Sequence, residues 1–304
     1  LGGERIHNFT VTSMFEDSIA SKLTIFDSNG DGYIDRIYVP DTGGNIYRID
    51  LPFTYDNKTE VKSRWTAMKL AELGSFVTST DDRRFFNPPA IVRGRNSDGT
   101  AYDGVLIGSG DITQPNSDDI TTNYFFNIKD DVTNATIWKG DYSGSSETNV
   151  RITPEPKKLS DLTNTVNGWK YELPAGGEKS LGAGVVIDGV VHFNSYTPFA
   201  DTLDPIELEN GQCVLNKTGD SSYYQMDLNT GSKITSRELL NTIAKDLAVH
   251  AGVNRHGVSV LRILGAGKGD STTVDGAPTL TGLIDTAVTL TPKWTYRYFN
   301  EAAQ

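Results

Sequence analysis

The chain has 304 residues, of which 37% are hydrophobic, and its formal net charge is −11. This length is ample for a hydrophobic core in one or two domains. The acidic balance and the lack of a Lys/Arg cluster argue against a nucleic-acid partner, because phosphate binding needs clustered cations. No run of about 18 apolar residues is present, so the sequence predicts no membrane-spanning segment.

The first residue is Leu rather than Met, and no signal peptide opens the sequence. We therefore expect the chain to be part of a longer precursor. Cys213 is the single cysteine and cannot form an internal disulfide. It leaves the cellular compartment open, since secreted proteins with a large core need no disulfides.

Short runs of β-branched and aromatic residues dominate the chain, and many of them alternate between apolar and polar positions. In chain order the predicted strands are "KLTIF", "DRIYV", "NIYRIDL", "GVLIGSG", "YFFNIKD", "GVVIDGVVHFNSY" and "YYQMDL". Turn residues separate these runs. Asp188 and Gly189, between "GVVI" and "VVHF", predict a two-residue hairpin turn.

Three segments depart from the strand pattern. Residues 64–73 fit either a short helix or a strand, and the polar residues 132–167 predict a long surface insertion. Residues 235–250 predict an α-helix, because Thr235 and Glu238 match a capping box and apolar residues then recur at helical spacing.

Many short strands with tight turns predict an all-β sandwich, barrel or propeller. A repeat favours the propeller: "DRIYVPDTGGNIYRIDL" resembles "GVLIGSGDITQP…NYFFNIKDD", with an apolar strand, a Gly/Asp turn and an aromatic strand. We expect four blade-like groups, near residues 20–50, 85–130, 168–231 and 256–298. Because terminal blades cannot bury their outer faces alone, we expect further blades on an upstream propeller segment of the same precursor.

An acidic loop, residues 27–35, carries the most specific motif in the chain. Oxygen ligands stand at alternate positions, with Gly32 at the sixth position for a sharp turn. The predicted Ca²⁺ ligands are Asp27, Asn29, Asp31, Tyr33 (through its backbone carbonyl) and Asp35. The twelfth position holds Tyr38 in place of the Glu of an EF-hand, so we expect the loop to join two strands. The alternative is an acidic Asp-Gly turn without a metal.

Several segments together resemble the PilY-type proteins, which are tip-located adhesins and biogenesis factors of bacterial type IV pili. They are the acidic loop with "GGNIYRIDL", "DRRFFNPPAI", "YDGVLIGSGDITQP", "YFFNIKDD", "GWKYEL…GEKSLGAGVVIDGVVHFNSYTP" and "YYQMDLNTG". The resemblance covers about residues 15–231, and residues 232–304 match the family pattern only loosely.

This resemblance implies a fold, a site and partners. The fold would be the C-terminal part of a modified β-propeller, with the acidic loop as its calcium site. Calcium occupancy would affect the balance of pilus extension and retraction and surface adhesion. The implied partners are minor pilins or the pilus tip and a host or abiotic surface, and the implied location is the bacterial cell surface, the pilus tip, or the periplasm and outer membrane.

Two other functions compete with a non-enzymatic pilus component. A propeller enzyme of the quinoprotein dehydrogenase type also carries calcium, and a calcium-containing lectin-like module is a weaker possibility. An enzyme needs a catalytic base, but the four histidines are scattered without metal-ligand spacing: His7, His192, His250 and His256. His192 alternates within "VVHFNSY", which predicts a hydrogen-bonded strand residue. We therefore expect no enzymatic activity.

Overall fold

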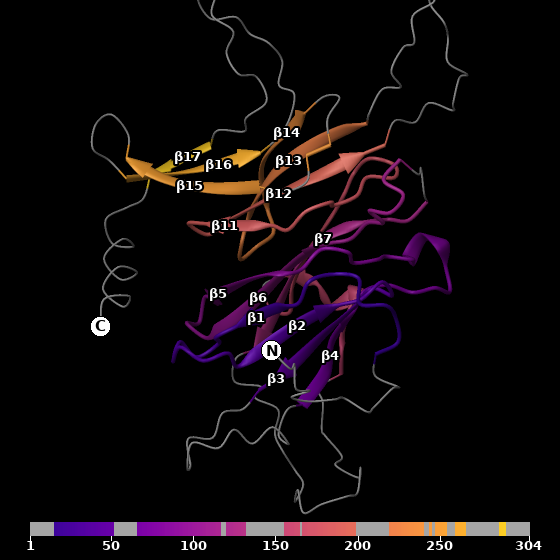
Figure 1. The fold of residues 1–304 in the computed structure, drawn as a ribbon, viewed down its shortest axis with the longest axis horizontal. Helices are drawn as coiled ribbons and strands as arrows, with labels where there is room; N and C mark the ends of the chain where they lie inside the picture. The colour runs from indigo at the N-terminus through magenta and orange to yellow at the C-terminus, as the bar shows by residue number, and fades with distance from the viewer. Residues whose placement is uncertain are drawn as a thin grey trace, which may run out of the picture.

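The computed structural model describes ten ranges of the chain. They are residues 15–51, 66–116, 120–131, 155–164, 166–198, 219–239, 243–244, 247–253, 259–265 and 286–289. Within these ranges the chain forms four β-sheets and no α-helix. The described helical elements are two short 3-10 turns, η3 (Ser79–Asp81) and η4 (Leu159–Asp161). No helix in these ranges is long and apolar enough to cross a membrane. The all-β class is confirmed (Figure 1).

The first sheet has the strand order β1-β2-β3-β4-β8. Its strands are β1 (Thr24–Phe26), β2 (Arg36–Pro40), β3 (Asn45–Asp50), β4 (Thr66–Glu72) and β8 (Lys157–Lys158). Neighbouring strands from β1 to β4 pair antiparallel, whereas β8 pairs with β4 in parallel. The ambiguous segment 64–73 is thus a strand over residues 66–72.

The second sheet has the strand order β5-β6-β7-β10-β9. Its strands are β5 (Ala90–Arg95), β6 (Ala101–Gly108), β7 (Tyr124–Asp131), β10 (Gly168–Glu172) and β9 (Thr163–Asn164). We predicted a surface insertion over residues 132–167, and most of it lies outside the described residues. Its end is not a surface loop, because it supplies β8 and β9 and the buried Leu162.

The third sheet has the strand order β11-β12-β13-β14. Its strands are β11 (Val185–Ile187), β12 (Val190–Thr197), β13 (Asp220–Asp227) and β14 (Lys233–Leu239). The predicted hairpin turn is confirmed, since Ile187 pairs with Val190 across it. Asp188 has φ 51° and Gly189 has φ 76°. Two successive positive φ angles are the conformation of a type I′ turn, which Asp-Gly favours.

The predicted helix at residues 235–250 is wrong. Its first part lies in β14, where Thr235 pairs with Gln225 and Ser236 with Tyr224 of β13. Its last part lies in β15 (Leu247–Val253) of a fourth sheet, which continues with β16 (Ser259–Gly265) and β17 (Thr286–Thr289). Residues 233–239 thus pair their backbone with the edge of β13, whereas a capping box satisfies only two donors at a helix end.

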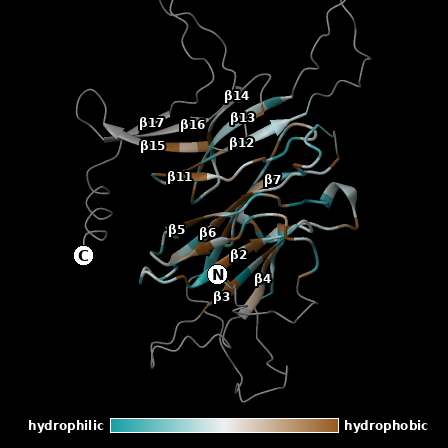
Figure 2. Cartoon of the chain, in the orientation of Figure 1, coloured by the Kyte–Doolittle hydropathy of each residue, from teal (hydrophilic) through white to brown (hydrophobic). Residues whose placement is uncertain are grey.

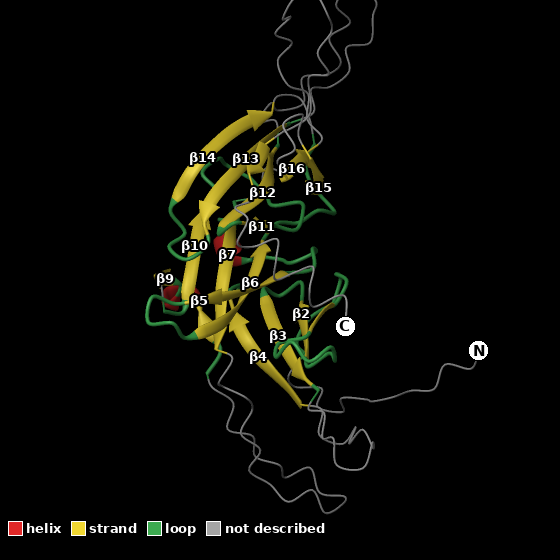
Figure 3. Cartoon of the chain, turned by 90° about the vertical axis from the view of Figure 1, so that its left-hand side faces the viewer, coloured by secondary structure: helices red, strands yellow, loops and turns green. Residues whose placement is uncertain are grey.

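The first three sheets follow one another in space in the order of the chain. In Figure 1 the indigo strands of the first sheet lie at the bottom and β11–β14 at the top, and Figure 3 shows the same succession from the side. Hydrophobic residues concentrate in the strands, while the second half of β12 is pale to teal (Figure 2). That these sheets are blades of the C-terminal part of a modified propeller stays a prediction.

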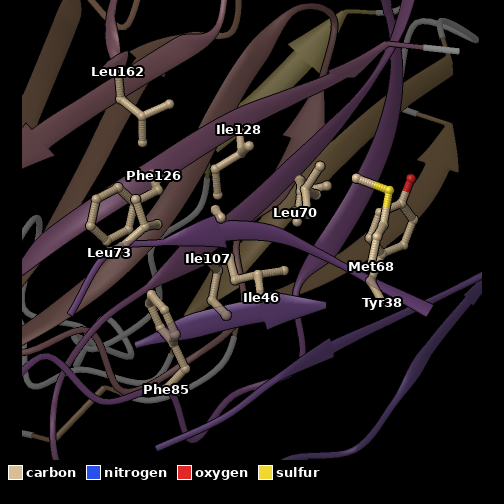
Figure 4. Close-up of a cluster of buried hydrophobic side chains, with 12 residues drawn as sticks. Tyr38, Ile46, Met68, Leu70, Leu73, Phe85, Ile107, Phe126, Ile128 and Leu162 are labelled. Carbon is tan, nitrogen blue, oxygen red and sulfur yellow. The ribbon is translucent and has the colours of Figure 1, made fainter. Parts of the chain in front are cut away.

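Two apolar clusters fill the spaces between these sheets. The cluster between the first and second sheets is drawn in Figure 4 and comprises Tyr38, Ile46, Met68, Leu70, Ala71, Leu73, Phe85, Val105, Ile107, Phe126, Ile128 and Leu162. In the cluster between the second and third sheets, the rings of Phe125 and Phe193 stack with their centroids 3.9 Å apart. Each sheet is therefore joined to the next by a buried apolar interface.

Candidate metal centre

The acidic loop connects β1 to β2 as predicted. Phe26 pairs with Arg36 across the base of the loop, and Asp35 N–H donates a 3.1 Å hydrogen bond to the Phe26 carbonyl. Within the loop Gly30 has φ 80° and Gly32 has φ 90°, a conformation that side-chain-bearing residues rarely adopt. The two glycines thus let nine residues curl back between two paired strands.

The side chains of the acidic loop fold onto the backbone of the loop itself. Asp27 accepts hydrogen bonds from Gly30 N–H at 2.6 Å and from Gly32 N–H at 2.7 Å, one on each carboxylate oxygen. Asp31 accepts from Tyr33 N–H at 2.9 Å. These bonds hold the loop in a curled conformation, and each carboxylate oxygen keeps lone pairs for a further partner.

Asn29, Asp31 and Asp35 lie next to one another. The Asn29 side-chain amide donates to Asp31 Oδ2 at 3.1 Å and to Asp35 Oδ1 at 3.4 Å. Asp35 Oδ2 also accepts from the N–H groups of Ser28 (2.8 Å) and Asn29 (3.1 Å). The structure therefore brings together three of the five predicted ligands.

The electrostatics of the loop favour a cation. Burial raises the pKa of Asp35, the hydrogen bonds from Asn29 and Ser28 N–H oppose this rise, and the charges of Asp31 and Asp27 add to it. A dication among these carboxylates would remove their repulsion.

The donor chemistry fits Ca²⁺, although the side chains are not gathered around one point. Among the described residues, no group of three or more His, Cys, Asp or Glu side chains is arranged to hold a metal ion. The Asn29 amide lies between Asp31 and Asp35, and it would have to turn its oxygen toward the ion. Carboxylate, amide and carbonyl oxygens are the ligands that Ca²⁺ prefers. The Tyr33 carbonyl stays a predicted ligand.

Behind the loop, two of its flanking side chains reach one buried carboxylate of the second sheet. Ser28 Oγ and Arg36 Nη1 each donate to Asp103 Oδ2 at 2.7 Å. Asp103 lies on β6 and is fully buried, and Arg93 Nη1 approaches its other oxygen at 3.2 Å. Sequence reasoning missed Asp103. Its one local signal is a charged residue inside the otherwise apolar strand "YDGVLIG".

The charges continue into the space between the first and second sheets. Asp130 of β7 pairs with Arg48 Nη1 at 2.6 Å and accepts a hydrogen bond from the Tyr38 hydroxyl at 2.8 Å. Burial alone would lower the pKa of Arg48, but Asp130 and Asp50 raise it above its ordinary value. Arg48 therefore stays charged, and the ion pairs form a structural network rather than a titrating site.

His192 is a hydrogen-bonded strand residue, as predicted. Its Nδ1 lies 2.7 Å from the Tyr223 hydroxyl, and the same hydroxyl accepts a hydrogen bond from Gln225 Nε2 at 3.0 Å. Burial lowers the pKa of His192 to about 4, so the ring is neutral at pH 7. His7 and His256 lie outside the described residues, and of His250 only the backbone is described.

Comparison with known proteins identifies a similar fold. Neither a protein-family model nor the sequence of a curated protein matches this chain. Among solved structures, the crystal structure of the C-terminal domain of Pseudomonas aeruginosa PilY1 matches with a TM-score of 0.50 and 16% sequence identity. The match covers 79% of this chain, which spans 58% of that one. At this identity the likeness concerns the fold alone, because one fold supports many functions. The chain thus has a fold similar to that of the PilY1 C-terminal domain.

Proposed function

We propose that this chain is a non-enzymatic, calcium-binding component of a type IV pilus machine that acts in pilus biogenesis and surface adhesion. The observation that carries the proposal is the acidic loop, whose oxygen ligands have calcium spacing and whose Asn29, Asp31 and Asp35 side chains are adjacent. The fold similarity to PilY1 and the family-like segments of the sequence support the pilus context.

In this proposal Ca²⁺ is held by Asp27, Asn29, Asp31, the Tyr33 carbonyl and Asp35. The ion supplies positive charge, which lets three carboxylates stay ionised close together. The sheets would be blades of a modified propeller that an upstream segment of the precursor completes. Its partners would be minor pilins or the pilus tip and a host or abiotic surface, with the protein at the bacterial surface, the pilus tip or the periplasm and outer membrane.

Thermal unfolding with and without Ca²⁺ tests the metal site. Extracellular calcium modules have Kd values near 10⁻⁴–10⁻³ M, and at ten times Kd a ligand adds about 1.4 kcal/mol to the free energy of unfolding. We expect Ca²⁺ to raise the Tm by a few degrees relative to a chelator, and Mg²⁺ to have little effect.

Two aspartate variants distinguish the loss of a loop ligand from the loss of any exposed aspartate. Asp31→Ala should abolish the Ca²⁺-dependent rise in Tm. Asp98→Ala is the matched control, because Asp98 also precedes a glycine in an exposed turn and accepts from Thr100 N–H at 2.9 Å. This control should respond to Ca²⁺ as the wild type does. Equal Tm values of the wild type in Ca²⁺ and in chelator would contradict the proposed site.

The pilus role is tested in the bacterium that produces the protein. Asp35→Ala should change the pilus number, twitching motility or attachment, whereas Asp98→Ala should not. Pili and attachment that are unaffected by Asp35→Ala would argue against the proposed role. A Ca²⁺-dependent dehydrogenase activity of the purified protein would favour the quinoprotein alternative instead.

A further inference from the structure

The two ends of the acidic loop are attached to the same atom of the second sheet. Ser28 directly follows Asp27, the first predicted ligand, and Arg36 directly follows Asp35, the last one. Both side chains donate to Asp103 Oδ2 at 2.7 Å. The loop and this oxygen therefore form one hydrogen-bonded unit across the interface between the first and second sheets.

Ser28 is the residue that links the ligands to this interface most directly. Its backbone N–H donates to Asp35 Oδ2 at 2.8 Å, while its hydroxyl donates to Asp103 on the other side. Ser28 is only 5% exposed, although the following loop residues are exposed. Ser28 thus bonds the Asp35 carboxylate through its backbone and the Asp103 carboxylate through its side chain.

The burial of Asp103 makes this link matter energetically. An ionised carboxylate that is shielded from water needs partners that compensate its charge, and losing such a partner lowers the stability of the fold. Of the three side chains that contact Asp103, Ser28 and Arg36 flank the loop ligands, and the third, Arg93, is 40% exposed and makes the longer contact of 3.2 Å. Arg36 lies on β2 and its guanidinium is also near Asp50 and Asp130. The Ser28 hydroxyl is therefore the Asp103 contact that depends directly on the curled conformation of the loop.

We propose that Asp103 couples cation occupancy of the acidic loop to the stability of the interface between the first and second sheets. This inference rests on the proposed calcium binding and adds to it a regulatory consequence. A cation that fixes the loop keeps the Ser28 hydroxyl on Asp103 and so strengthens the contact between the two sheets. By thermodynamic reciprocity, an intact Asp103 contact raises the affinity of the loop for the cation.

Hydrogen exchange measured by mass spectrometry tests the coupling, because it reports the loop and β6 separately. At ten times the Kd, Ca²⁺ should slow exchange by about elevenfold for amides whose opening destroys the site. In the intact wild-type protein we expect Ca²⁺ to slow exchange both in residues 27–35 and in β6, which contributes none of the predicted ligands.

Ser28→Ala removes the hydroxyl bond to Asp103 and keeps the backbone bond to Asp35. At saturating Ca²⁺ this variant should still show slowed exchange in the loop, while the Ca²⁺-dependent slowing in β6 should fall to less than about a third of the wild-type factor. Calorimetric titration should show Ca²⁺ binding weakened by about fivefold or more. Ser109→Ala is the matched control, since it removes a buried hydroxyl that bonds Asn123 at 2.9 Å just beyond the end of β6, and it should behave as the wild type.

The outcomes separate the coupling from the proposed function. Loop protection by Ca²⁺ with equal β6 protection in the wild type and in Ser28→Ala would overturn the coupling alone. Loop protection without any β6 protection in the wild type would do the same. A wild-type loop whose exchange is unchanged by Ca²⁺ would overturn the proposed metal site, and the coupling with it.

Discussion

Arg48 and Asp130 form an ion pair of 2.6 Å between residues that are 82 positions apart in the sequence. Arg48 lies on β3 of the first sheet and Asp130 on β7 of the second, and both side chains are buried. Charges that are removed from water are stable only when their partners are well placed. This pair therefore fixes how the first two sheets meet, in addition to the apolar cluster beside it.

We expect Arg48→Leu to lower the free energy of unfolding by about 3–5 kcal/mol, because it leaves the Asp130 carboxylate buried without its closest cation. Chemical denaturation measures this change. Lys158→Ala is the control: Lys158 Nζ lies 2.7 Å from Glu72, but the two side chains are 48% and 39% exposed. Removal of this surface pair should cost at most about 1 kcal/mol. Equal effects of the two substitutions would show that burial does not strengthen the Arg48 pair.

The interface between the second and third sheets depends on aromatic packing. Phe193 of β12 is fully buried and stacks on Phe125 of β7 and on Tyr224 of β13. Phe193→Ala removes these contacts and leaves a cavity, so the free energy of unfolding should fall by about 3–5 kcal/mol. The exposed Val77 provides the comparison, and Val77→Ala should change stability by less than about 0.5 kcal/mol. A stable Phe193→Ala variant would mean that the interface can collapse around the cavity.

Local patterns predicted the strands well, because alternating residues and tight turns act over a few positions. "NIYRIDL" and "YFFNIKD" became β3 and β7, and Asp188 and Gly189 form the expected turn. The four groups of strands also correspond broadly to the four sheets. We expected residues 168–231 to form one group, but β10 at the start of this range belongs to the second sheet. There it pairs with β7, which is far from it in the sequence.

Non-local contacts explain what the sequence did not reveal. Residues 235–250 have a capping-box pattern and apolar spacing that suit a helix, but residues 233–239 pair as a strand with the edge of β13. Tertiary context of this kind overrides local propensity. The proposed loop ligands form a motif within nine residues, so a sequence pattern alone is enough to name them. Asp103 could not be predicted in this way, since its partners Ser28 and Arg36 lie 75 and 67 positions away.

The buried His192 should make stability depend on pH. Its pKa is lowered from 6.5 to about 4 by burial, so the unfolded state binds the proton more tightly between these two values. Its contribution is therefore fully present above pH 6.5 and is lost as the pH falls toward 4, by up to about 3 kcal/mol.

Urea unfolding of the wild type and of His192→Gln at a series of pH values measures this contribution. Carboxylates that titrate in the same range are common to both proteins and cancel in the difference. The stability difference between the two proteins should change by about 2–3 kcal/mol between pH 7.5 and pH 4.5, with the wild type losing more. A difference that does not change with pH would show that His192 is not held neutral in the folded state.

Gly32 should be required because of its backbone conformation, and not because a side chain at this position would clash with its neighbours. Its φ of 90° disfavours any side chain, yet no atom lies within 4 Å of the position that a Cβ would occupy. Gly99 offers a matched control, with φ 86° and equally open surroundings in the turn between β5 and β6. Gly32→Ala and Gly99→Ala should each destabilise the fold by about 1 kcal/mol, because both force alanine into a strained conformation.

Only Gly32→Ala should weaken Ca²⁺ binding, since Gly32 lies among the predicted ligands. Titration calorimetry on both variants measures this, and equal Ca²⁺ affinities would mean that the curl at Gly32 plays no part in the site.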